Sequence, residues 1–417
     1  MKRALWFGAV LLIHATASAA PAPEQVNEHA GLAIFSDGVS LWDEDADAVA
    51  RRLGLPAESR TTGDASYRLY PADDARVFGR RPYSIAISAQ DGRPVALNFV
   101  FANKGDSVGL FERVRPGERT RRPAKLLRDY RRAIGEDDRA LDSALEELFG
   151  PAEPERTGSA GQLQERSLRR DWNGHALLLV GVRDEYVALR IVPPSELDGA
   201  SRPERVPAKE LKSRLAAQVE RRANGDVVIR DIPMVDQGPK GFCVPATMER
   251  MLRHLGIPAD MYLLAMAANT DPGGGTRVSD VVAAVNRTAQ RHGRRIVTLT
   301  GSPKNGVVAE WIEAGIPLLW AIDTSTAIDD LINERTKERL QVTDWAAWKD
   351  SLKSARRDAR KLARAADGGH VCLVTGFNKD TGEIAISDSW GPEYAERWIT
   401  QEEAAAISQG SLVAVSW

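Results

Sequence analysis

In the part of the chain that follows Val227, helical apolar patterns come first and strand-like patterns come last. This order constrains the fold more than any other feature of the sequence. Apolar residues follow helical spacing at 243–254, and a second helical pattern lies at 277–293. The last three apolar segments are short and rich in Val, Ile and Leu, which is typical of strands (370–378, 382–389 and 411–417). Helices first and strands last favour an α+β domain over a doubly wound sheet.

Residues 30–200 carry a pattern of a helix followed by a β-hairpin, and this pattern occurs twice. A helix is expected at 40–56 and a hairpin at 83–103, turning at Asp91-Gly92. A second helix at 138–153 and a second hairpin at 175–193 follow in the same order. We therefore expect an α+β accessory domain, interpreted as a duplicated helix–hairpin unit, with a domain lacking internal symmetry as the alternative.

Residues 1–19 have the three parts of a secretory signal peptide in order. Lys2 and Arg3 are basic, residues 4–13 are apolar, and Ala17-Ser18-Ala19 fits a cleavage site. A buried N-terminal helix or strand is the alternative. No later segment approaches 18 uninterrupted apolar residues. We expect an exported protein, periplasmic or secreted, with no stable membrane insertion after the signal is removed.

Two further segments divide the chain. Residues 201–226 mix prolines and charges with a helical stretch at 209–223, which indicates a connector between the domains. The second domain then covers 227–417. Within it, residues 326–367 are charged and helix-rich and indicate a helical insertion, whose basic end is a solvated helix face or, alternatively, a lid or docking arm.

Composition argues against several classes of function. The net charge is −2, the pI is about 6.4, and acidic and basic residues are interspersed, so we expect no nucleic-acid partner. Two cysteines and six histidines give no metal-ligand cluster. The glycine-rich turn at 271–276 lacks the Lys-Ser/Thr pair of a phosphate loop. We therefore expect no metal and no cofactor, and the oligomeric state stays open.

Cys243 lies at the expected start of a helix. Pro245 follows it, and proline is favoured in the first turn of a helix. A helix N-terminus stabilises a thiolate, which is the nucleophilic form of cysteine. A small buried apolar residue is the alternative interpretation.

Three other residues fit a catalytic role with Cys243. His370 begins a strand after two glycines, and a hairpin with the next strand would bring Asp388 back beside it. A carboxylate there would orient the imidazole and support its protonated form. Gln237 precedes Cys243 across a loop with two glycines, so its amide and the Cys243 N–H could both donate to an oxyanion.

These motifs resemble the papain-like cysteine peptidases. "QGPKGFC", "GGHVCLVTGFN" and "SDSWG" are similar to the cysteine, histidine and Asn-Ser-Trp-Gly segments of that superfamily, with Asp388 in place of asparagine. Residues 228–417 look most similar to bacterial peptidases that process double-glycine leader peptides, and to their stand-alone relatives. The resemblance implies a helical half packed on an antiparallel sheet, with Cys243 as nucleophile, His370 as general base, Asp388 as orienting residue, Gln237 as oxyanion donor and Trp390 as a shield over the His–Asp pair.

The expected function is that of an exported cysteine peptidase which hydrolyses a peptide or protein substrate through an acyl-enzyme. The same triad would also serve a papain-fold acyltransferase or a wall-peptide amidase. A catalytically inactive papain-fold binding protein is a third interpretation. The sequence leaves the substrate and the role of residues 30–200 open.

Two features of the sequence qualify this expectation. Many members of the superfamily have small residues after the cysteine, whereas this chain has Val244-Pro245, which we expect to narrow substrate access. Cys372 shares the strand face of His370 by period-two spacing. It is therefore either a core residue or the partner of Cys243 in an inhibitory disulfide.

Overall fold

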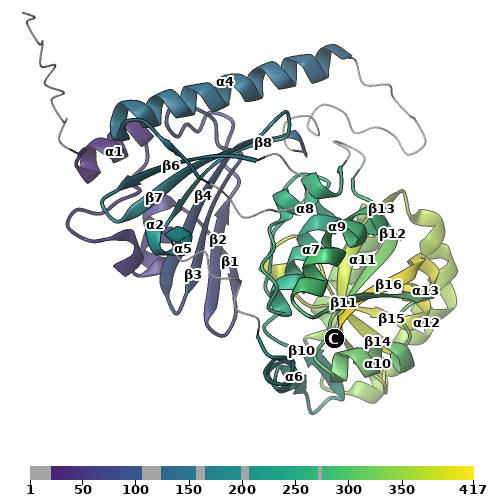
Figure 1. The fold of residues 1–417 in the computed structure, drawn as a ribbon. Helices are drawn as coiled ribbons and strands as arrows, with labels where there is room; N and C mark the ends of the chain where they lie inside the picture. Colours follow the sequence, from purple (N-terminus) through teal and green to yellow (C-terminus); the bar gives the residue numbers. More distant parts are fainter. Residues whose placement is uncertain (1–19, 106–123, 156–164, 199–205, 271–274) are drawn as a thin grey trace, which may run out of the picture.

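The computed structural model describes residues 20–105, 124–155, 165–198, 206–270 and 275–417. They form two eight-stranded sheets, each with helices packed against it (Figure 1). The expected signal peptide lies outside the described residues. No helix in the described ranges is long and apolar enough to cross a bilayer.

The first sheet is antiparallel throughout, in the order β1-β2-β3-β4-β8-β7-β6-β5. Its core lies on one face, under three helices: α1 (Pro23–Ala30), α2 (Ala46–Leu53) and α4 (Ala124–Phe149). The strands are β1 (Ala57–Arg60), β2 (Asp64–Leu69), β3 (Ser84–Gln90), β4 (Arg93–Asn103), β5 (Glu153–Pro154), β6 (Glu165–Trp172), β7 (His175–Val182) and β8 (Tyr186–Val192). A short helix, α5 (Pro194–Asp198), follows the last strand.

The strand order of this sheet is symmetric about one pair of strands, while the duplication of a helix–hairpin unit stays a prediction. Each half consists of a helix followed by four sequential strands, and the two halves meet where β4 pairs with β8. Both expected hairpins are present, as β3–β4 and β7–β8. The first turns at Asp91-Gly92, both with positive φ, as a tight hairpin turn requires. The second helix begins much earlier than the expected residue 138, because an amphipathic helix carries no marked start signal there.

The second sheet runs β11-β16-β12-β13-β10-β9, and β14 and β15 extend it from β13. All pairings are antiparallel. The strands are β9 (Val219–Arg221), β10 (Asp226–Ile229), β11 (Arg295–Thr300), β12 (Leu318–Thr324), β13 (Gly368–Asn378), β14 (Glu383–Ser387), β15 (Arg397–Thr400) and β16 (Ser408–Ser416). This part of the chain thus joins helices to an antiparallel sheet, as the α+β expectation requires.

Helices cover both faces of the second sheet, each over its own apolar cluster. One face packs against α6 (Ala208–Ala217), α7 (Cys243–His254), α8 (Met261–Ala267) and α9 (Val278–Arg291). The other packs against α10 (Asn305–Glu313), α11 (Thr326–Arg339) and α13 (Gln401–Ile407), beside α12 (Trp345–Ala365). The connector prediction needs correction, because Leu211 and Leu215 are buried in the second domain's core and β9 extends its sheet. The expected helix at 209–223 therefore ends at Ala217, where the strand takes over.

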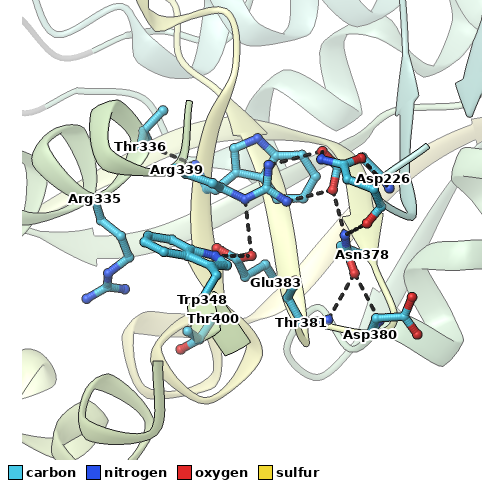
Figure 2. A network of polar contacts seen from close by, with 12 residues as sticks. Asp226, Arg335, Thr336, Arg339, Trp348, Asn378, Asp380, Thr381, Glu383 and Thr400 are labelled. Atoms are coloured by element: carbon cyan, nitrogen blue, oxygen red, sulfur yellow. Dashed lines mark hydrogen bonds and ion pairs between the residues drawn. The ribbon is translucent and has the colours of Figure 1, made fainter. Parts of the chain in front are cut away.

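The helical insertion, α11 and α12, is fixed to the sheet by a buried polar network (Figure 2). Arg339 at the end of α11 donates to Asp226 at 2.6 and 3.0 Å and to Glu383 at 3.1 Å. The Trp348 indole N–H of α12 also donates to Glu383. Asn378 of β13 donates to Asp226 at 2.7 Å. The two helices are thereby joined to β10, β13 and β14.

Candidate active site

Cys243 is the first residue of α7, where the sequence places the helix start. The thiol is half-buried. One turn on, the Thr247 hydroxyl donates to the Val371 carbonyl at 3.1 Å, beside His370 on β13. The buried Arg250 side chain donates to the Ser387 hydroxyl, at 2.5 Å, and to the Pro233 carbonyl. The two side chains fix the rotation of α7 relative to β13 and β14, and therefore the direction of Cys243.

His370 and Asp388 form a buried pair at the ends of adjacent strands. Their strands, β13 and β14, are antiparallel with Leu373 opposite Ser387, so the residues beyond those positions lie close together. His370 Nε2 is 2.8 Å from Asp388 Oδ1. His370 is 6 % exposed and Asp388 is fully buried, which shields this hydrogen bond from water.

Cys243 approaches the same imidazole from α7. It lies within hydrogen-bonding reach of His370, and because Nε2 faces Asp388, Nδ1 is the nitrogen left for the thiol. Burial lowers the pKa of His370, but the contacts with Asp388 and Cys243 outweigh burial and raise the pKa to about 10. The structure therefore brings Cys243, His370 and Asp388 together, and the two contacts of the imidazole favour its protonated form.

Arg397 on β15 is a site residue that the sequence analysis did not single out. Its guanidinium donates to Asp388 Oδ2 at 2.6 and 2.8 Å, so Asp388 lies between a histidine and an arginine. Burial raises the pKa of Asp388, but the charge of Arg397 and the hydrogen bond with His370 hold it below its usual value. The far side of Arg397 contacts Asp329 of α11 at 3.3 Å. The insertion thus contacts the arginine that binds Asp388.

Trp390 covers the imidazole. Its ring is stacked on His370, with centroids 4.5 Å apart and planes 28° apart. Tyr394 packs edge-on against the Trp390 ring, and the Arg397 guanidinium lies 5.1 Å from the Trp390 ring centroid. This is the position that the resemblance implies for a shield over the His–Asp pair.

Gln237 lies in the loop before α7, and its side-chain amide forms a hydrogen bond within that loop. Its Nε2 donates to the Lys240 carbonyl at 3.0 Å, and its backbone N–H donates to the Ser389 carbonyl at 2.8 Å. The residue is 8 % exposed. The loops that carry Gln237 and Asp388 are therefore joined by a backbone hydrogen bond.

The two cysteines are free thiols, and the structure does not favour the disulfide considered above. Cys372 is fully buried in the apolar cluster beneath α10 and α11. Cys243 packs against the cluster on the opposite face of the sheet. Burial raises the pKa of the Cys372 thiol well above its usual range, which makes it a poor nucleophile. The core interpretation of Cys372 therefore fits.

Val244 and Pro245 are also buried, and Val244 packs in the apolar cluster between α7 and the sheet. The expectation that they narrow access to Cys243 stays a prediction. Among the described residues, no group of three or more His, Cys, Asp or Glu side chains is arranged to hold a metal ion.

Comparison with known proteins finds a family match within the second domain. Residues 229–409 match the Peptidase_C39 like family. A search of curated proteins found no match. Among solved structures, the chain is similar to the peptidase domain of Streptococcus ComA, a bi-functional ABC transporter involved in a quorum sensing pathway, with 14 % identity, a TM-score of 0.28, and coverage of 44 % of this chain and 96 % of that one. The family match, together with the helix-and-sheet architecture, assigns residues 229–409 to the papain-like cysteine peptidase superfamily.

Proposed function

We propose that the protein is an exported cysteine peptidase which cleaves peptide bonds with a Cys243–His370–Asp388 triad. The observation that carries the proposal is the buried pair of His370 and Asp388, 2.8 Å apart, set against a half-buried thiol at a helix start. Nucleophilic catalysis by cysteine requires a thiol close to a base whose orientation is fixed, and here Cys243 and His370 would supply these two groups.

The proposed reaction runs in two stages. The Cys243 thiolate attacks the scissile carbonyl, and the oxyanion receives hydrogen bonds from the Cys243 N–H and the Gln237 amide. The His370 imidazolium protonates the leaving amine, which gives a thioester with Cys243. Neutral His370 then takes a proton from water, the resulting hydroxide attacks the thioester carbonyl, and the C–S bond breaks, which releases the acid and restores the Cys243 thiolate beside the His370 imidazolium. Asp388 keeps the imidazole oriented in both stages.

Trapping of the thioester tests this proposal directly. A peptide library is incubated with the reduced full-length protein, the mixture is quenched in acid, and the peptides of a digest are mapped by mass spectrometry. We expect cleaved peptides together with an acyl adduct on Cys243. Products formed by joining an acyl group to an added amine would instead indicate an acyltransferase, and cleavage of wall fragments alone would indicate an amidase.

The pH dependence of the thiol provides a second prediction. The raised pKa of His370 should keep its imidazolium form beside Cys243 up to a pH of about 10. Replacing Asp388 by asparagine removes the anion that stabilises the imidazolium, so the pKa of His370 should fall by about one to three units. The rate at which iodoacetamide alkylates Cys243, measured from pH 5 to 11, should show its alkaline change at lower pH in Asp388→Asn. Equal profiles would contradict the assigned role of Asp388.

The linked effect on stability has a definite sign. The folded-state pKa of His370 lies above its usual value of 6.5. The contribution of His370 to the free energy of unfolding is therefore complete below pH 6.5 and is lost as the pH rises through about 10. The wild-type protein should therefore lose more free energy of unfolding between pH 6.5 and 10 than His370→Gln does.

Export is proposed from the signal-like residues 1–19 alone. Expression of the full chain in a bacterium should yield a shortened protein outside the cytoplasm, with an N-terminus near Ala20. Replacing Ala17 and Ala19 by bulky residues should block the shortening. A full-length chain found only in the cytoplasm would overturn this part of the proposal.

A further inference from the structure

The loop that leads to Cys243 is fixed by side chains of the first domain. The Met234 N–H donates to Ser59 Oγ at 2.9 Å, and the Asp236 N–H donates to Glu58 Oε1 at 2.8 Å. The Tyr70 hydroxyl donates to the Asp236 carbonyl at 2.5 Å. All three partners belong to β1 or to the residue that follows β2. The backbone directly before Gln237 therefore takes its hydrogen bonds from another domain.

Glu58 is the centre of this contact and is itself held in place. It is 3 % exposed, and its Oε1 also accepts from Arg68 Nε at 2.6 Å. Its Oε2 accepts from the Ser66 hydroxyl at 2.9 Å. Because both oxygens have donors, the carboxylate cannot rotate away from the Asp236 N–H without breaking buried hydrogen bonds.

Tyr70 packs beneath the same loop. Gly238 has a φ of +66°, and a Cβ there would lie 2.6 Å from the Tyr70 ring. The Lys240 ammonium lies 4.3 Å from the centre of that ring. A side chain at Gly238 has no room, so the loop lies in direct contact with the first domain between Asp236 and Lys240.

Buried apolar residues extend the contact between the two domains as far as α7. One buried cluster joins strands of the first sheet to the nucleophile helix and its neighbour, and its members include Val100, Val180, Ala188, Phe242, Ala246 and Tyr262. A Cβ on Gly105, just past β4, would collide with the Phe242 ring, 2.3 Å away. The first domain thus touches the residues on both sides of the Gln237–Lys240 turn.

Gln237 is therefore held from two directions. Asp236 before it is bound by the first domain, and its own N–H is bound by Ser389, next to Asp388. We propose that the first domain is a positioning part of the catalytic site, and that Glu58 and Tyr70 are positioning residues which hold Gln237 where its amide meets the oxyanion. The inference rests on the proposed function, and it gives residues 30–200 a role in catalysis. Misplacement of a catalytic group by about 1 Å can lower a rate about 10²-fold.

The test compares two full-length variants of the first domain. Glu58→Gln keeps the shape of the side chain but cannot accept every donor around it. Glu44→Gln is the matched control, because Glu44 also accepts from an arginine and a serine, Arg52 and Ser36, both within the first domain. Thermal unfolding of both variants measures any general loss of stability.

Hydrogen exchange gives a readout that needs no activity. The amides of Met234, Asp236 and Gln237 should exchange at least about 10-fold faster in Glu58→Gln than in Glu44→Gln, since the acceptor of one of them is lost. Equal exchange in both variants would overturn the inference even if the protein proves to have no peptidase activity.

Kinetics then separate positioning from stability. For a peptide that the wild type cleaves, we expect kcat of Glu58→Gln to fall about 10- to 100-fold with little change in KM. Alkylation of Cys243 by iodoacetamide, which forms no oxyanion, should stay within twofold of the wild type. Tyr70→Phe, which removes one hydroxyl, should show a smaller fall of the same kind.

A double variant shows whether Glu58 acts through Gln237. If it does, Glu58→Gln combined with Gln237→Ala should be no slower than Gln237→Ala alone. If the double variant instead loses kcat by the product of the two single losses, or if Glu58→Gln keeps the wild-type kcat, the inference is overturned while the proposed peptidase function stays intact. Absence of cleavage by the wild type would instead contradict the proposed function.

Discussion

Cys243→Ala should lower kcat for peptide hydrolysis by about 10⁴-fold or more, which is the largest effect expected of any single change in this chain. The thiol is the group that would form the bond to the substrate carbonyl. Without it, His370 and Asp388 have no nucleophile to activate, although the residues around them stay in place. The measurement is single-turnover cleavage of a library-selected peptide by the full-length protein, with the acyl adduct on Cys243 as a second readout.

The chain offers its own control in Cys372→Ala. Cys372 is fully buried on the other face of the sheet, so its loss should leave a small cavity and change kcat only a few-fold. Thermal unfolding of both variants shows whether either effect arises from misfolding. Full activity in Cys243→Ala, or loss of activity in a folded Cys372→Ala, would contradict the assignment of the nucleophile.

The contact between His370 and Asp388 could be predicted from the sequence because one short hairpin carries both residues. Apolar strand segments on each side of a polar turn determine which residues come near one another, and the observed register, with Leu373 opposite Ser387, follows that rule. The start of α7 could also be predicted from the sequence, because proline in the first turn of a helix is a local signal. In both cases the information lies within a few residues of the site.

Arg397 could not be found in this way. It lies on a four-residue strand between a proline-containing turn and an acidic helix, too short for a period-two pattern, and the sequence analysis assigned no strand there. Its partner Asp329 belongs to the insertion, and a contact between residues so far apart in the sequence produces no periodic pattern that could predict it. The contact of Glu58 with Asp236 is hidden for the same reason, since it joins two domains.

Arg397→Met should destabilise the protein by about 3–5 kcal/mol and also slow catalysis. The guanidinium lies between Asp388 and Asp329, and both it and Asp388 are almost completely buried. Methionine fills a similar volume but leaves a buried carboxylate without its cation, so the pKa of Asp388 should rise. A protonated Asp388 supports the His370 imidazolium less well. We therefore expect kcat to fall, and we expect the alkaline change in the rate of Cys243 alkylation to occur at lower pH.

Arg335→Met is the matched control for this change. Arg335 of α11 forms an ion pair with Glu403 of α13, so its loss should cost stability without altering the alkylation profile. A double variant then isolates the charge itself. Because Asp388→Asn removes the unpaired anion, its combination with Arg397→Met should be more stable than the sum of the two single losses predicts, by about 1 kcal/mol or more. Strict additivity would mean that Arg397 stabilises the fold by packing against the Trp390 and Tyr394 rings and not by neutralising Asp388.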